Sequence, residues 1–503
     1  MTRRTVLGVL ASPWVGSASS AEFDPNFGSA LSAAAAIRAR KISSLELTKH
    51  VFQRIDRYQP RLNAFVYLLR EEAFAQARRA DQAVARKDKL PPLHGVPVLV
   101  KESFGVAGRP CTWGIPALKE TRAEANSTAV QRLLEAGAVL VGATNVPFQL
   151  MDGQSYNEIY GTTNNPWDLT RTPGGSSGGT AAALAAGLGF LGLGSDIGGS
   201  IRAPAHCCGI FGHKPTLDVV SLQGHAPGGA MQDPGFSTLL AVAGPMARAA
   251  EDLEAALRVI GGPEAPESLA YTWRLPEPRH RRLRDFRVGY VLEDPLMRVS
   301  SEIKPALESA VRACEKAGAK LRAGWPAGFS LSEMFRHYLV MLWAFDFSML
   351  PPDEQQRRKA EFAARPGDLQ AHGALIDFAS WQRHNLRRLA FRAMWQRYFR
   401  DFDVFLLPAL PVPAFPHDHS RPLDRRTLPT PEGPLPYVEG LLAYMSVAVL
   451  TGGPATVVPV GKTAAGLPVG IQILGPYLED ATPIRFAALL AGETGGFTPP
   501  PRY

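Results

Sequence analysis

The chain has 503 residues, 46% of them hydrophobic, and a formal net charge of +8. This length and composition allow a large buried core and indicate a soluble globular protein. The basic residues are spread along the chain and accompany no recognisable nucleic-acid-binding module, so we expect no nucleic-acid partner. Beyond the N-terminus, no segment has the roughly 18 uninterrupted apolar residues that a membrane span requires.

The N-terminus resembles an export signal. Arg3 and Arg4 precede an apolar stretch over residues 6–15, and small residues continue to Ala21. This order is typical of a twin-arginine signal, which would make the protein periplasmic or exported. The alternative is an unstructured basic tail on a cytoplasmic enzyme, and both interpretations of residues 1–21 stay open.

The four cysteines are Cys111, Cys207, Cys208 and Cys314. Adjacent cysteines are poor disulfide partners, so no disulfide framework is expected. His206 and His213 lie near Cys207 and Cys208, but the Cys-x-x-Cys spacing of a zinc site is missing, and we predict no metal.

Three helices are predicted before residue 90. The alanine-rich stretch from Ser29 predicts the first, and Ser43 with Glu46 forms a capping-box pattern that opens the second. A third helical pattern covers residues 70–85. We expect the first two of these helices to pack outside the core.

A buried strand is predicted over the apolar residues 95–100, directly before Lys101. A lysine that is desolvated at the end of such a strand loses its proton more easily and can act as a base. Ser127 is predicted to cap a helix that stops at Gly137, and residues 138–141 predict another buried strand. This order of elements predicts a sheet with helices on both faces.

Residues 145–165 have few hydrophobic repeats and predict a loop that reaches the active site. The alternative is a loop that only packs against the serine-rich segment that follows.

Two serines are surrounded by glycines, Ser176 in the segment 174–179 and Ser200 in the segment 196–200. Glycine lets the backbone approach a ligand closely and exposes N–H groups. Consecutive N–H donors can hold the negative oxygen of a tetrahedral intermediate, with Ser200 as the nucleophile. The candidate donors are Ile197, Gly198, Gly199 and Ser200.

The order and spacing of these blocks resemble the amidase signature family. The resemblance covers the chain from about Ser29 onward and is carried by segments 98–102, 173–179 and 194–202. It implies a Ser-Ser-Lys relay. The implied catalytic residues are Ser200 as the acyl-forming nucleophile, Ser176 as the bridging serine and Lys101 as the base.

The resemblance also implies a fold, namely a three-layer α/β/α sandwich around a mixed β-sheet. It implies a single domain over residues 29–503, with a motif core at about 90–260 and a variable substrate region at about 265–440. A cis peptide bond is implied before Ser176. The segment implied to line the substrate cavity consists of Leu150, Met151, Asp152 and Gly153.

The second half of the chain continues the alternation of strands and helices. Predicted strands cover residues 288–292, 403–407, 455–459 and 468–474, and a helix covers residues 303–317. The aromatic-rich stretch 329–400 forms either plain core or part of a substrate pocket. The proline-dense stretch 408–436, with His417 and His419, predicts a long exposed loop or lid.

Two other motifs compete with this interpretation. Gly174-x-Ser176-x-Gly178 fits the nucleophile elbow of α/β-hydrolases, but residues 168–173 do not predict the strand that this motif requires. A dinucleotide fingerprint at residues 187–192 follows a helical pattern rather than a strand, so we reject it.

Four polar residues near the motifs are predicted to support the site. Glu102 and Asp196 are expected to provide hydrogen bonds or electrostatic support rather than acid–base chemistry. Arg202 is expected to anchor the backbone, and Ser177 to bond to the lysine side of the relay.

These observations predict an amidase that converts a small-molecule carboxylic amide to an acid and ammonia or an amine through a serine acyl-enzyme, without a cofactor. The first alternative is a glutamine amidohydrolase similar to the amidase-type component of the amidotransferases, which acts in a complex. The second is a catalytically silent binding protein. The oligomeric state is left open, with a homodimer among the options.

Overall fold

The computed structural model describes residues 23–231, 238–365 and 367–503. The candidate export signal at residues 1–21 lies outside the described residues.

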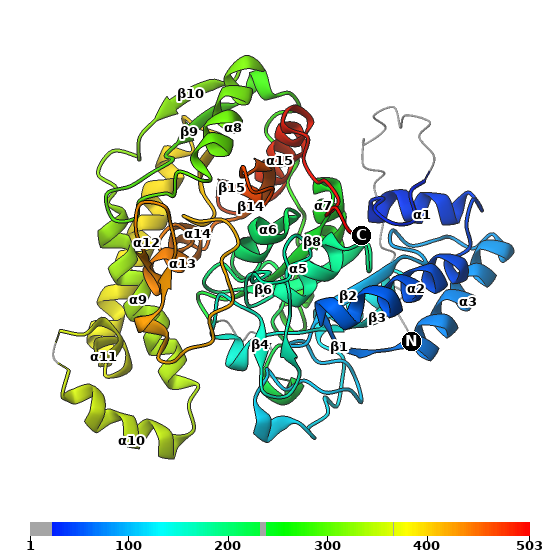
Figure 1. Ribbon diagram of the computed structural model, residues 1–503, viewed down its shortest axis with the longest axis horizontal. Coiled ribbons are helices and arrows are strands. Elements are labelled where there is room, and N and C mark those ends of the chain that lie inside the picture. Colours follow the sequence, from blue (N-terminus) through cyan, green and yellow to red (C-terminus); the bar gives the residue numbers. More distant parts are fainter. Residues whose placement is uncertain (1–22, 232–237, 366) are drawn as a thin grey trace.

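A mixed sheet of eleven strands runs through the molecule in the order β1-β3-β2-β6-β8-β7-β14-β15-β11-β9-β10 (Figure 1). Its strands are β1 (Phe65–Leu68), β2 (Pro97–Lys101), β3 (Val139–Thr144), β6 (Leu191–Asp196), β7 (Phe211–Lys214), β8 (Val242–Ala247), β9 (Arg287–Tyr290), β10 (Lys320–Ala323), β11 (Val404–Pro408), β14 (Ala455–Lys462) and β15 (Pro468–Leu474). Strand β2 is parallel to β3 and β6, whereas β8 is antiparallel to β6 and β7. Two small two-stranded sheets lie outside it: β4 (Tyr156–Asn157) with β5 (Gly161–Thr162), and β12 (Thr427–Leu428) with β13 (Leu435–Pro436).

Helices pack on this sheet and extend beyond one edge of it. They are α1 (Ala30–Arg38), α2 (Ser44–Leu62), α3 (Arg70–Arg86), α4 (Thr128–Glu135), α5 (Gly178–Ala185), α6 (Arg202–Cys208), α7 (Ala250–Ile260), α8 (Lys304–Lys316), α9 (Leu331–Ser348), α10 (Pro352–Ala363), α11 (Leu369–Ala374), α12 (Phe378–Tyr398), α13 (Tyr437–Leu442), α14 (Ser446–Thr451) and α15 (Ala481–Thr494). Helices α7 and α15 pack on each other and on β8 and β14, while α5 and α6 pack on each other and on β6 and β7. The predicted α/β class with a mixed sheet is confirmed.

The local sequence signals are mostly confirmed. Ser43 and Glu46 form the predicted capping box at the start of α2. The prediction for Ser127 was partly wrong, because it occupies the N-cap of α4 but its buried hydroxyl has no hydrogen bond within the described residues. The backbone N–H of Ser127 donates to Gly105, and its side chain packs against Gly224.

Strands from the second half of the chain, β9 to β11 with β14 and β15, complete the same sheet. Helices α10 and α11 lie away from the sheet at the lower left of Figure 1, and α9 and α12 pack against α14. Within the described part of the chain, no helix is both long and apolar enough to cross a bilayer.

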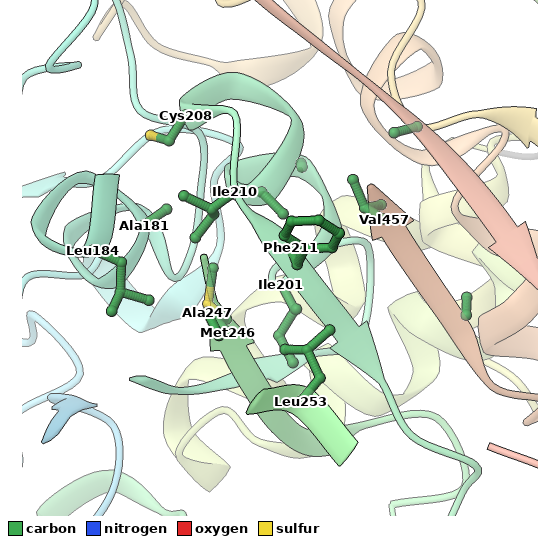
Figure 2. Packing of buried hydrophobic residues seen from close by; sticks show 14 of the residues in the cluster. Ala181, Leu184, Ile201, Cys208, Ile210, Phe211, Met246, Ala247, Leu253 and Val457 are labelled. Atoms are coloured by element: carbon green, nitrogen blue, oxygen red, sulfur yellow. The ribbon is translucent and has the colours of Figure 1, made fainter. Parts of the chain in front are cut away.

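The core directly behind the glycine-rich segments fixes the position of Ser200. Its neighbour Ile201 packs among residues of α5, β7, β8 and β14 (Figure 2). Gly194, Gly212 and Gly244 lie on three adjacent strands, and a Cβ on any of them would come within 2.9–3.1 Å of the Ile201 side chain. Because these three positions are glycines, they leave the space that the Ile201 side chain fills.

Candidate active site

Lys101 ends β2 and is completely buried. Its Nζ donates hydrogen bonds to the Oγ of Ser176 at 2.7 Å and to the Oγ of Ser195 at 2.9 Å. Burial lowers the pKa of Lys101 to about 7, although the carboxylate of Asp196 opposes this effect. The neutral amine is therefore well populated near neutral pH and can accept a proton.

Ser176 lies two residues before the start of α5 and is almost fully buried. The Gly175–Ser176 peptide bond is cis, as the family resemblance implies. Gly175 lies against the backbone of Asp152 and Gln154, where any Cβ would collide. The glycine thus lets the serine segment and the loop after β3 meet at the site.

Ser200 lies between β6 and α6, is 9% exposed, and faces the same cavity as Ser176. The N–H of Ser177 donates to the carbonyl oxygen of Ser200 at 3.1 Å, which joins the two serine segments. Within the described residues, no hydrogen bond links the hydroxyls of Ser176 and Ser200. Both hydroxyls can therefore meet a substrate in the cavity.

Asp196 and Arg202 organise the turn around Ser200. They form a fully buried ion pair at 2.8 Å, and Asp196 also accepts hydrogen bonds from the N–H groups of Gly199 and Ile201. Burial alone would raise the pKa of Asp196, but the Arg202 guanidinium outweighs burial and holds this pKa below its ordinary value. Both residues support the backbone, as predicted.

One of the four predicted oxyanion donors was wrong. The N–H of Gly199 is engaged by Asp196 at 2.9 Å. In the described part of the chain, the N–H groups of Ile197, Gly198 and Ser200 have no hydrogen-bond partner. These three remain available for a negatively charged oxygen.

Two further predictions about supporting residues have different outcomes. The Glu102 carboxylate accepts hydrogen bonds from Thr112 and Trp113, which is the expected supporting role, and burial raises the pKa of Glu102 to about 7. The expectation for Ser177 was wrong, because its Oγ lies 3.4 Å from backbone atoms of Ser195 and does not contact Lys101. Ser195, on β6, takes that place.

A cavity of about 460 Å³ opens above these serines. Its walls are mostly apolar and come from the loop after β3, from α9, and from α13. Leu150, Met151, Asp152 and Gly153 all line it, as the resemblance implies. Of the aromatic residues in the stretch 329–400, Trp343 and Phe345 also line it, whereas most of the others pack in the core.

The stretch 408–436 differs from the exposed loop or lid that its prolines suggest. Residues 408–415 are buried, and Gln154 exchanges two hydrogen bonds with the backbone of Asp418. Arg426 forms a buried ion pair with Asp152 at 2.8 Å. The half-buried His417 hydrogen-bonds Asn164. The stretch is therefore tied to the loop after β3 and forms part of the cavity wall through Leu423.

Ser195, His225 and Asp346 also face the cavity and were not predicted from the sequence. The position of Ser195 could have been predicted, because it follows Gly194 on the strand that leads to Ser200. Asp346 carried no local signal because it lies in an apolar helical pattern. Within the described residues, no three histidine, cysteine or acidic side chains gather to hold a metal ion.

Comparison with known proteins agrees with this geometry. The Amidase family model matches residues 46–483. The chain is 32% identical to an indoleacetamide hydrolase of Bradyrhizobium diazoefficiens, covering 93% of this chain and 86% of that protein. It is 30% identical to one component of the glutamyl-tRNA(Gln) amidotransferase of Carboxydothermus hydrogenoformans, covering 90% and 94% of the two chains.

The fold is also shared with a solved bacterial aryl acylamidase of the amidase signature family, with a TM-score of 0.78, 24% identity, and coverage of 93% of this chain and 96% of that one. The family match spans most of the sequence and includes the buried lysine and both glycine-flanked serines. The chain therefore belongs to the amidase family of enzymes, which hydrolyse carbon–nitrogen amide bonds.

Proposed function

We propose that Ser200 forms an acyl-enzyme with a carboxylic amide, and that Ser176 and Lys101 relay the protons. The observation that carries this proposal is the hydrogen bond from the buried Lys101 to Ser176, at the base of the cavity that Ser200 lines. A lysine with a pKa of about 7 can serve as a base at neutral pH.

The reaction runs in two halves. Ser200 gives its proton to Ser176, which passes its own to Lys101, and the Ser200 oxygen attacks the carbonyl carbon. The N–H groups of Ile197, Gly198 and Ser200 hold the oxyanion. Lys101 returns its proton through Ser176 to the leaving nitrogen, and the carbon–nitrogen bond breaks. Water then attacks the acyl group, and the same relay restores the Ser200 hydroxyl.

The substrate occupies the cavity beside the segment 150–153. Because most of the cavity wall is apolar, it suits an amide with an apolar body larger than glutamine. The alternative of a glutamine-hydrolysing component of a complex predicts that the isolated chain prefers glutamine or is inactive.

Labelling with a fluorophosphonate probe, followed by peptide mapping, tests the assignment. We expect the label on Ser200, with loss of labelling in Ser200→Ala and a strong decrease in Lys101→Ala. Label on Ser176 would instead favour the nucleophile-elbow mechanism. A folded protein that takes no label and hydrolyses no amide would contradict the proposal.

A further inference from the structure

One acidic side chain in the cavity lacks a counter-charge. Asp346 lies near the C-terminal end of α9 and lines the cavity with Leu342, Phe345 and Met349. Its carboxylate has no hydrogen bond and no ion pair among the described residues. The side chain is partly exposed to the cavity, and its withdrawal from bulk water raises the pKa of Asp346 to about 7, since no neighbouring charge or donor stabilises the ionised form.

The other two cavity carboxylates are satisfied. Asp152 is paired with Arg426 at 2.8 Å, and Asp196 is paired with Arg202 at 2.8 Å. The described residues that line the cavity include no lysine and no arginine. Asp346 is therefore the one described cavity carboxylate that a bound ligand would have to neutralise.

The position of Asp346 relative to the reacting serines follows from α9. The hydroxyl of Tyr338, on the same helix, donates to the carbonyl oxygen of Ile197 at 3.0 Å, next to the candidate oxyanion donors. Asp346 follows eight residues later, about 12 Å along the helix axis at 1.5 Å per residue and about 80° around it at 3.6 residues per turn. Leu342 lies between them and faces the cavity. An apolar stretch thus separates the serines from the carboxylate.

We propose that Asp346 selects amides that carry a positively charged nitrogen at the far end of an apolar spacer from the scissile amide. This inference rests on the proposed function, since it assumes that the scissile carbonyl lies at Ser200. An isolated carboxylate in an apolar cavity is unfavourable, and an ammonium group supplies both the missing charge and the missing N–H donors. The apolar wall between Tyr338 and Asp346 accommodates the spacer.

Two isosteric amides test the proposal, 8-aminooctanamide with a terminal ammonium group and nonanamide with a methyl group in its place. We expect kcat/KM to favour the amino compound by about 10- to 100-fold, the range for a hydrogen bond to a charged group. In Asp346→Asn, or Asp346→Ala if the first variant folds poorly, this preference disappears, mainly through a higher KM for 8-aminooctanamide. Nonanamide turnover is unchanged or faster. Asp353→Asn is the matched control, because it also removes one negative charge but at an exposed position.

Binding to the Ser200→Ala variant, measured by calorimetry, gives a readout that does not depend on turnover. We expect tighter binding of 8-aminooctanamide than of nonanamide, and loss of this difference in Ser200→Ala combined with Asp346→Asn. Equal binding of the two amides, or equal kcat/KM for the two amides, would overturn the inference. An equal decrease in kcat/KM for both amides in Asp346→Asn would also overturn it. Absence of Ser200 labelling and of all amide hydrolysis would instead be a failure of the proposed function.

Discussion

The Nζ of Lys101 lies 2.7 Å from the Oγ of Ser176, and no part of the lysine side chain reaches solvent. Its pKa is therefore set by the protein interior, where burial lowers it to about 7. Proton exchange with a substrate must pass through the serine hydroxyls at the base of the cavity.

We expect kcat/KM to rise with pH through about 7 and then to level off, because Lys101 accepts a proton only as the neutral amine. Lys101→Met should lower activity by about 10²- to 10⁴-fold, the usual contribution of a general base. A pH–rate profile of the wild-type protein checks the first expectation. Glu102→Gln is the control, since burial also raises the pKa of Glu102 to about 7. If this variant lost the rise near pH 7, Glu102 rather than Lys101 would control the profile.

Ser195→Ala should lower kcat by about tenfold with little change in KM, because it removes one of the two acceptors that orient the Lys101 amine. Ser195→Thr retains a hydroxyl and should recover most of the activity. Ser177→Ala is the matched control, since Ser177 does not contact the lysine. Steady-state kinetics of the three variants distinguish these outcomes, and an equal loss in Ser195→Ala and Ser177→Ala would rule out a positioning role.

Arg202→Met should destabilise the fold by about 3–5 kcal/mol, because it leaves the buried Asp196 carboxylate without its partner. The exposed pair between Arg312 and Glu308 is the control, and Arg312→Ala should cost less than about 1 kcal/mol. Thermal and denaturant unfolding measure both variants. Equal stability losses would mean that burial of the first pair has no special effect.

A cluster of three histidines leads us to expect that the folded protein loses stability in acid. The Nδ1 atoms of His337 and His384 lie 2.9 Å apart, and the ring of His372 lies beside His384. Burial, helped by charge on the other two rings, lowers the pKa of His384 to about 4, below its unfolded value of about 6.5. The unfolded chain therefore binds more protons between these values, and stability decreases as the pH falls from about 6.5 to 4.

The melting temperature as a function of pH checks this expectation. His384→Gln should flatten the dependence in that range, whereas Gln382→Ala, an uncharged substitution at an exposed position two residues away, should leave it unchanged. A dependence that persists in His384→Gln would assign it to other groups.

Local sequence patterns predicted the elements whose formation depends on neighbouring residues. The capping box at Ser43 and the apolar run before Lys101 both formed as predicted, because each interaction lies within a few residues of the chain. The glycine-rich serine segments carried the family resemblance for the same reason. These short-range signals were sufficient to place the lysine and both serines at one site.

Contacts between distant segments were not predictable in this way. Asp152 pairs with Arg426 across 274 residues of sequence, and that pairing changes the expected lid into a part of the cavity wall. In the sequence, Asp346 is one polar residue in an apolar helix, and only the fold places it in the cavity wall. No pattern within α9 carries this information, because the cavity is formed by segments that are far apart in the sequence, from Trp113 to Leu442.

The hydrogen bond from Tyr338 to Ile197 also constrains how this enzyme can acquire new substrates. The first half of α9 supports the backbone beside Ser200, whereas its second half faces the far end of the cavity. Substitutions around Tyr338 therefore risk the reaction itself, while substitutions of the cavity-lining residues Trp343, Phe345, Asp346 and Met349 act on what the cavity accepts. Evolution or a protein engineer can thus vary the last two turns of one helix and leave the chemistry intact.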